Sequence, residues 1–131
     1  MWMSSLTDEQ RKALLGLAHN VIVSDGLLDP NEELMLDEFK REMELNRELQ
    51  PEYLELEGIE TIFASRRAQA IAILNLLHLS YVDGAFEIEE ECLLREISQT
   101  FGIDDDEFRL MDNWIKRLVA LETEARSFMT S

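Results

Sequence analysis

The amino-acid sequence predicts an all-α fold, a compact bundle of about six to seven helices. Apolar residues recur at helical spacing in several long segments, and no segment of convincing length alternates as a half-buried strand does. A helix–turn–helix pattern also occurs twice in the chain. At 131 residues and 46% hydrophobic composition, the chain is expected to form a single domain with its own core.

The repeat is centred on an acidic segment that follows the first helix of each copy. Residues 25–33 (DGLLDPNEE) match residues 83–91 (DGAFEIEEE), an offset of 58 positions, and apolar positions farther along match as well. Such repeats use one supersecondary unit twice, each copy completing a core that the other cannot close alone. The predicted organisation is one domain over residues 1–131, with two pseudo-symmetric helix–turn–helix units at about 8–46 and 66–104 and a closing helix at about 105–127.

The first unit begins with a capping box at Thr7, which predicts a helix running to about Ser24. Its apolar residues lie almost all round the helix, so much of it should be buried. In the next helix, Asp29 is expected to be the N-cap, Pro30 the first helical residue and Glu32 a side chain that reaches back to the cap. The inward face of that helix is expected to carry Leu36, Phe39 and Met43.

An acidic connector over about residues 45–65 separates the two units. Pro51 is expected to open a short helix with apolar residues on one side, and Gly58 is expected to end it. A further short packed turn is expected at residues 59–63.

The second unit is expected to begin near Arg66 with a helix that is apolar all round through Val82. This helix should therefore be the central one. Gly102 is expected to end the helix that follows the second acidic turn. Asp104 should cap the last helix, whose acidic first turn suits the positive end of the helix dipole.

The charge of the chain limits its partners. A net charge of −16 makes nucleic acid and anionic membranes poor partners, because binding them requires many Lys and Arg side chains. Cations and basic protein surfaces remain as natural partners.

Three features of the sequence bear on localisation. The longest apolar run, residues 68–82, is too short to insert across a bilayer, and the N-terminus lacks the regions of a signal peptide. A single cysteine permits no internal disulfide. A cytoplasmic protein is therefore expected.

Three features of each acidic segment resemble the TerB tellurite-resistance family. An apolar helix ends in Asp-Gly, an apolar residue follows two positions after the glycine, and a glutamate lies seven positions after the aspartate. These residues are Asp25, Gly26, Leu28 and Glu32 in the first copy and Asp83, Gly84, Phe86 and Glu90 in the second. The resemblance covers essentially the whole chain. The resemblance implies a pseudo-symmetric helical bundle from a bacterium. It also implies a role in stress or tellurite resistance and metal binding through acidic residues.

Asp25 and Asp83 are the leading candidate metal ligands. A carboxylate at the C-terminal end of a helix faces the negative end of the dipole, which costs about 0.3–1 kcal/mol when exposed, so a local interaction should offset it. A divalent cation would do so, and clustered carboxylates suit Ca²⁺ or Mg²⁺ better than Zn²⁺. The candidate ligand sets are Asp25 with Asp29 or Glu32, and Asp83 with Glu87 or Glu90. In the structural alternative, each aspartate accepts N–H groups of its own turn and binds no ion.

Other polar residues give weaker signals. His78 and Asn75, one turn apart on the apolar helix, are expected to form a hydrogen-bonded core pair. Cys92 aligns with an apolar residue of the first copy and is expected to be a buried thiol. Trp2 and Trp114 are expected to be packing anchors. No nucleophile motif or Gly-rich phosphate loop occurs, so neither an enzyme nor a cofactor beyond a divalent metal ion is expected.

The sequence therefore favours a non-enzymatic acidic module that binds a divalent cation of Ca²⁺ or Mg²⁺ type through duplicated Asp-Gly turns, in bacterial stress or tellurite and metal resistance. The alternative is a protein-interaction scaffold whose acidic surface recruits a basic partner, with the turns purely structural. It stays open at this point whether the two turns form one shared site or two separate sites.

Overall fold

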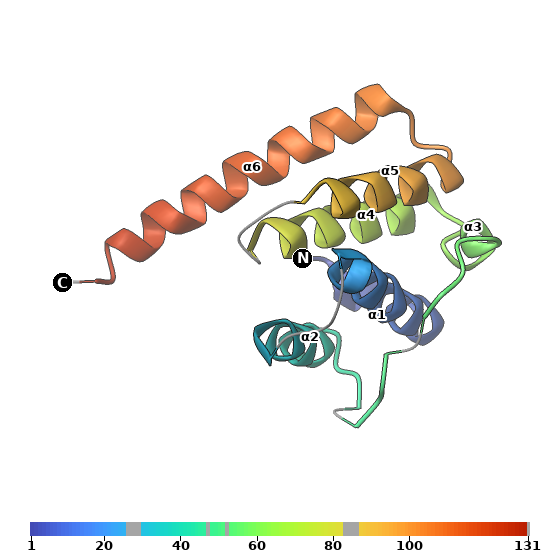
Figure 1. Ribbon diagram of the computed structural model, residues 1–131, viewed down its shortest axis with the longest axis horizontal. Coiled ribbons are helices and arrows are strands. Elements are labelled where there is room, and N and C mark those ends of the chain that lie inside the picture. Colours follow the sequence, from blue (N-terminus) through green and yellow to red (C-terminus); the bar gives the residue numbers. More distant parts are fainter. Residues whose placement is uncertain (26–29, 47, 52, 83–86, 131) are drawn as a thin grey trace.

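The computed structural model describes residues 1–25, 30–46, 48–51, 53–82 and 87–130, with Asp25 described by its backbone alone. All regular structure in these ranges is helical, which confirms the predicted all-α class (Figure 1). The α-helices are α1 (Asp8–Ile22), α2 (Pro30–Glu42), α3 (Ile59–Ile62), α4 (Arg66–Val82), α5 (Ile88–Thr100) and α6 (Asp105–Ser127). Two short 3₁₀ turns are η1 (Met3–Ser5) and η2 (Val23–Asp25).

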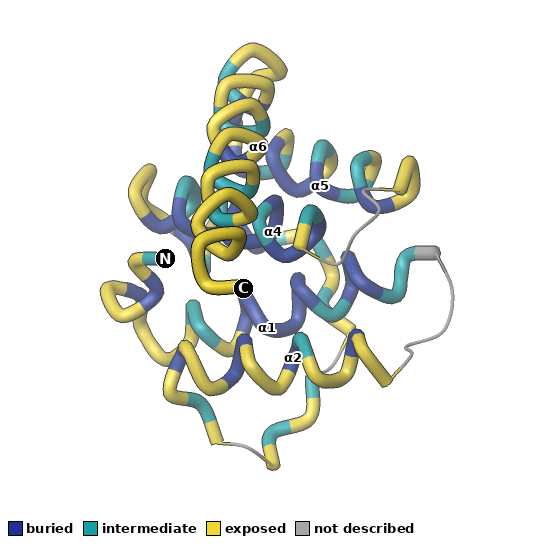
Figure 2. Tube along the Cα trace, turned by 90° about the vertical axis from the view of Figure 1, so that its left-hand side faces the viewer, coloured by how far each residue is buried: buried dark blue, intermediate teal, exposed yellow. Residues whose placement is uncertain are grey.

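α1 and α4 form the centre of the bundle. They pack against each other and both contact α5, while α2 lies on α1 and α6 lies on α4. The buried parts of the trace gather on α1 and α4 and on the facing side of α5 (Figure 2). Leu14 and Leu17 of α1 and Leu76 and Leu77 of α4 are completely buried. Because each such side chain contributes about 1.5–3 kcal/mol on leaving water, this helix pair supplies a large part of the hydrophobic stabilisation.

The helix bounds repeat as the sequence does. α1 and α4 begin 58 positions apart, and α2 and α5, each of 13 residues, also begin and end 58 positions apart. Each copy is therefore a long buried helix followed by a shorter amphipathic one. The pseudo-symmetry of the two units in space stays a prediction.

Local side-chain caps fix two of the helix starts as predicted. Thr7 Oγ1 accepts the Gln10 N–H at 3.1 Å, and Gln10 Oε1 accepts the Thr7 N–H at 3.0 Å, which completes the capping box of α1. Asp104 Oδ1 accepts the Glu107 N–H at 2.8 Å at the start of α6. Gly102, with φ of 78°, follows α5 and allows the chain to turn into α6.

The connector differs from its prediction, because the described residues from 51 to 57 form no helix. Gly58, with φ of 86°, is the N-cap of α3 and does not end a helix. The reason lies in α1, where buried Asn20 donates from Nδ2 to the Leu54 carbonyl at 2.7 Å. Asn20 Oδ1 also accepts the Leu54 N–H at 3.4 Å. Both backbone groups of Leu54 are therefore bonded to α1, so they are not available for a helical turn.

α6 packs along α4 and α5 and then extends beyond them (Figure 1). Phe108 and Ile115 are its buried residues, and every described residue from Thr123 onward is exposed. Near its start, Glu107 forms an ion pair with Arg66 of α4. The end of α6, from Thr123 onward, is therefore open to solvent.

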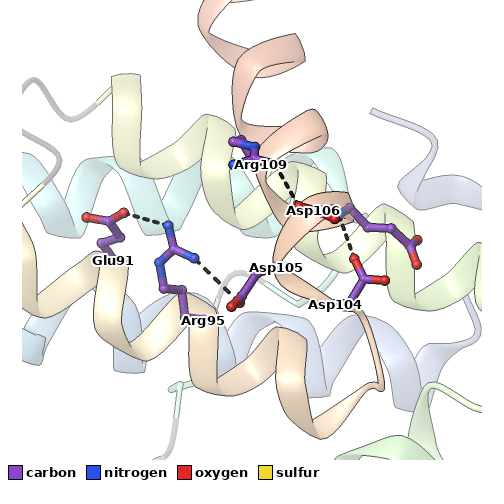
Figure 3. A network of polar contacts seen from close by, with 7 residues as sticks. Glu91, Arg95, Asp104, Asp105, Asp106 and Arg109 are labelled. Atoms are coloured by element: carbon purple, nitrogen blue, oxygen red, sulfur yellow. Dashed lines mark hydrogen bonds and ion pairs between the residues drawn. The ribbon is translucent and has the colours of Figure 1, made fainter.

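Arg95 fixes the junction between α5 and α6 (Figure 3). Its guanidinium lies 3.2 Å from Glu91 Oε1 and 3.6 Å from Asp105 Oδ1. The same group lies 4.8 Å from the ring centroid of Phe108. Exposed ion pairs and a cation–π contact contribute about 1 kcal/mol or less each. Their combined effect is to fix the angle at which α6 leaves α5.

The expectation that Cys92 is buried is wrong. Cys92 is exposed, because the inward positions of α5 are taken by Glu90, Leu94 and Ile97, and residue 92 faces away from them. Trp2 and Trp114 pack against each other, as expected of packing anchors, but outside the core. Their ring centroids lie 6.2 Å apart at the surface, where both side chains stay partly exposed.

Candidate functional site

The predicted ligands divide into those that the structure describes and those that it does not. Asp29 and Asp83 lie outside the described residues, as does the side chain of Asp25. Glu32, Glu87 and Glu90 are described, and they lie at the starts of α2 and α5. The structure therefore describes the candidate ligands on the two helices, and the three aspartate side chains lie outside the described residues.

Glu32 and Glu90 hold the same position in the two copies and are both buried, with 7% and 2% of their surface exposed. Each is the third residue of its helix. The third residue of α1, Gln10, makes the reach-back contact of a capping box while only half-buried. Capping therefore does not require the burial of this side chain. The burial of a glutamate at both matching positions is therefore a feature that the two copies share beyond helix capping.

The neighbours of the buried glutamates face solvent. Glu33, Glu87 and Glu89 are exposed, and Glu91 is half-buried beside Arg95. The Glu87 N–H donates to Glu90 Oε1 at 3.4 Å, which is the reach-back contact of a capping box. Of the predicted second-copy ligands described, Glu90 faces inward and Glu87 remains at the surface.

The start of the first acidic turn lies beside the second copy. η2 ends at Asp25 and packs against α5, which also contacts α1. The chain therefore enters the first Asp-Gly turn next to the helix that carries Glu90. Among the described residues, no three His, Cys, Asp or Glu side chains come together as a metal site would require.

A second polar site lies in a cleft of about 320 Å³ between α2, α4 and α6. His78 of α4 and Glu122 of α6 meet across it, with Nε2 2.8 Å from Oε1. The predicted His78–Asn75 pair is wrong. Asn75 Nδ2 instead donates to the carbonyls of Met1 at 2.9 Å and Ile71 at 2.8 Å. His78 and Glu122 are 44 positions apart, and nothing local in the sequence relates them.

The lining of this cleft combines apolar and acidic side chains. The apolar residues are Met1, Met35, Phe39, Leu79 and Val82, and the carboxylates are Glu38, Glu42 and Glu122. Its described lining includes no Ser, Cys or Lys that could act as a covalent nucleophile. The sequence does contain a partial signal, since Met35 with Phe39 and Glu38 with Glu42 form adjacent rows on α2. It does not show which element these rows face.

Tyr81 and Asp112 form a further contact between α4 and α6. The Tyr81 hydroxyl donates to Asp112 Oδ1 at 2.5 Å. Burial, this hydrogen bond and the negative charges of Asp112 and Glu91 raise the pKa of Tyr81 well above its ordinary value of about 10. The phenol is therefore a hydrogen-bond donor that ties the two helices together.

No helix in the described ranges combines the length and apolar character that crossing a bilayer requires. Comparisons of the chain with protein-family models, with curated proteins and with solved structures found no match.

Proposed function

We propose that the chain is a cytoplasmic, non-enzymatic acidic module that binds a divalent cation of Ca²⁺ or Mg²⁺ type through its Asp-Gly turns. The setting in bacterial stress or tellurite and metal resistance comes from the resemblance to the TerB family. The observation that carries the proposal is the burial of Glu32 and Glu90 at matching positions in the two copies.

The burial of these glutamates favours a cation partner for a physical reason. An inward carboxylate is stabilised by positive charge, and hard divalent cations bind clustered carboxylate oxygens. Each buried glutamate lies seven positions after the aspartate of its Asp-Gly pair. Asp25 and Asp83 are therefore suitable partners in the ligand sets. A bound divalent ion would also lessen the self-repulsion of a chain with a net charge of −16.

The packing of η2 on α5 favours ligands drawn from both copies. The 3₁₀ turn η2, which ends at Asp25, contacts the helix that carries Glu90, and this contact supports ligands drawn from both copies. Of the two arrangements that the sequence leaves open, a shared or bridged site is therefore preferred.

The test is thermal unfolding followed by circular dichroism, on chelator-treated protein titrated with Ca²⁺, Mg²⁺, Mn²⁺ and Zn²⁺. Ca²⁺ or Mg²⁺ should raise Tm saturably, because an ion at about 100 times its Kd stabilises the native state by about 2.7 kcal/mol. Asp25→Asn, Asp83→Asn and Glu90→Gln should abolish the rise, and the neighbouring exposed variant Glu89→Gln should retain it. A small rise common to all four ions and kept in every variant would mean charge screening and would contradict the proposal.

The acidic cleft favours a second candidate function, the recruitment of a basic protein segment. Its lining combines three carboxylates with apolar side chains, which suits an amphipathic segment with Lys or Arg side chains and one apolar anchor. The Asp-Gly turns would then be structural.

A fluorescein-labelled amphipathic peptide of Lys and Leu residues is a direct probe of this second function. Its anisotropy should rise with added protein, and the affinity should fall several-fold in Glu38→Gln/Glu42→Gln and at high salt. The matched variant Glu55→Gln/Glu57→Gln makes the same charge change at exposed connector positions and should bind as the parent does. Equal loss in both double variants would indicate nonspecific attraction to an acidic protein.

A further inference from the structure

α6 carries a second apolar face that no described residue of the chain fully covers. Its core-facing side is centred on Phe108 and Ile115. The second face lies roughly 130° around the helix from Ile115, at about 100° per residue. It comprises the exposed side chains of Leu110, Trp114, Leu121 and Phe128.

The spacing of these residues is that of a helix–helix contact. Successive steps of four and three positions run through residues 110, 114, 117, 121, 124 and 128, which define what we term the α6 seam. Single exposed apolar residues are ordinary on a protein surface, but four of them in one heptad row are not scattered. The two remaining seam residues, Arg117 and Glu124, are exposed and of opposite charge.

We propose that the α6 seam is a self-association surface, through which two copies of the chain pair their α6 helices in antiparallel orientation about a two-fold axis near Leu121. This arrangement sets Arg117 opposite the partner's Glu124, and the symmetry repeats the pair. Trp114 then faces the partner's Phe128, and the two Leu121 side chains meet at the axis. A parallel pairing would instead set Arg117 against the partner's Arg117, so charge complementarity selects the antiparallel form.

The distribution of charge identifies a second copy as the occupant of the seam. Residues 113–131 contain three basic side chains, Lys116, Arg117 and Arg126, against two acidic ones, Glu122 and Glu124. This segment therefore carries a net charge of +1, and the remaining residues carry −17. Two copies that meet through this segment therefore bring less like charge together than the average of the chain would. The C-terminal part of α6 is thus suited to a contact between two copies of this acidic protein.

The shape of α6 is compatible with such a pairing. The helix extends beyond α4, so a partner helix has room beside it (Figure 1). The seam is about 27 Å long from residue 110 to residue 128. At its middle, a hollow of about 190 Å³ is lined by Trp114, Arg117, Leu118 and Leu121. In the antiparallel arrangement this hollow receives the partner's exposed Phe128.

Sedimentation equilibrium of the full chain over a range of concentrations tests the proposal. The mass should rise from 15.2 kDa toward twice that value with concentration. Leu121→Glu should weaken association about tenfold or more, because it places a charge at the centre of the contact. Ala120→Glu adds the same charge one residue away, off the seam, and should still associate. A monomer at every concentration, or equal loss in both variants, would overturn the proposal.

Charge reversal tests the antiparallel orientation. Arg117→Glu and Glu124→Arg should each weaken association, because each sets two like charges opposite each other. The double variant should restore association, because the ion pair between residues 117 and 124 then forms again with its two charges exchanged. In a Cys92→Ser background, Leu121→Cys should form an intermolecular disulfide under mild oxidation, and Lys116→Cys, off the seam, should not. Failure of the double variant to recover would rule out the Arg117–Glu124 pairing, and no disulfide at residue 121 would rule out the axis.

Discussion

The hydroxyl of Tyr81 donates a 2.5 Å hydrogen bond to Asp112 Oδ1, which joins the C-terminal end of α4 to α6. Burial is the largest cause of the raised pKa of Tyr81, followed by this bond and by the charges of Asp112 and Glu91. The neutral phenol is therefore favoured in the folded state. The bond connects the central helix to the helix that extends from the bundle.

The first prediction concerns stability at alkaline pH. Below pH 10, folded and unfolded chains both keep the Tyr81 proton, and its stabilising contribution is fully present. Above pH 10 the unfolded chain loses the proton first, so stability should fall as pH rises toward the folded-state pKa. Urea unfolding between pH 8 and pH 11 should show a steeper fall in the parent than in Tyr81→Phe. Tyr53→Phe, at an exposed position, should keep the parent's slope, and identical slopes in all three proteins would refute the assignment.

The second prediction concerns the amide bridge between α1 and the connector. Asn20→Ala removes both hydrogen bonds between the buried Asn20 side chain and the backbone of the half-buried Leu54. The free energy of unfolding in urea should fall by about 1–3 kcal/mol. Asn46→Ala removes an exposed hydrogen bond to the Glu48 N–H and should change stability by about 0.5 kcal/mol or less. A similar effect in both variants would mean that the bridge does not hold the connector.

The third prediction tests α4 as the central helix. Leu77→Ala opens a cavity at a completely buried position and should destabilise the protein by about 2–5 kcal/mol. Leu34→Ala makes the same change on α2, where the side chain is 63% exposed, and should have little effect. The measurement is again urea unfolding. A loss of under about 1 kcal/mol at Leu77 would contradict its place in a packed core.

The fourth prediction concerns the turn between α5 and α6. Gly102 has φ of 78°, a conformation that L side chains rarely adopt, although an added Cβ would meet no atom within 4 Å. Gly102→Ala should therefore cost about 1 kcal/mol through backbone strain alone. Gly102→Asn should cost less, because asparagine tolerates the left-handed region better. Equal losses in the two variants would point to a cause other than φ, and thermal unfolding provides the comparison.

The sequence predicted the features that depend on neighbouring residues. The capping box at Thr7, the cap at Asp104 and the turn at Gly102 all involve residues within a few positions of one another, and all three are confirmed. The helix expected at Pro51 is wrong because Asn20, 31 positions earlier in the chain, holds the connector. The helix propensity of residues near Pro51 carries no information about a contact with a residue so far away in the sequence.

The candidate site was predictable to a similar extent. The 58-residue offset identified Glu32 and Glu90 as equivalent, but their burial depends on packing around α2 and α5 that a repeat does not specify. The meeting of His78 with Glu122 and the cleft around them arise from the approach of α6 to α4. The sequence gives the faces of these helices, and the tertiary structure decides which faces meet.

The contact between Trp2 and Trp114 has a spectroscopic consequence. The chain has two tryptophans, and both belong to this one ring pair, with centroids 6.2 Å apart. All indole emission therefore originates where the N-terminal segment meets α6, and excitation energy passes between the two rings. Intrinsic fluorescence is thus a local reporter of this contact and not a general measure of folding. The contact between the N-terminal segment and α6 can therefore be followed by fluorescence in the native protein without an attached dye.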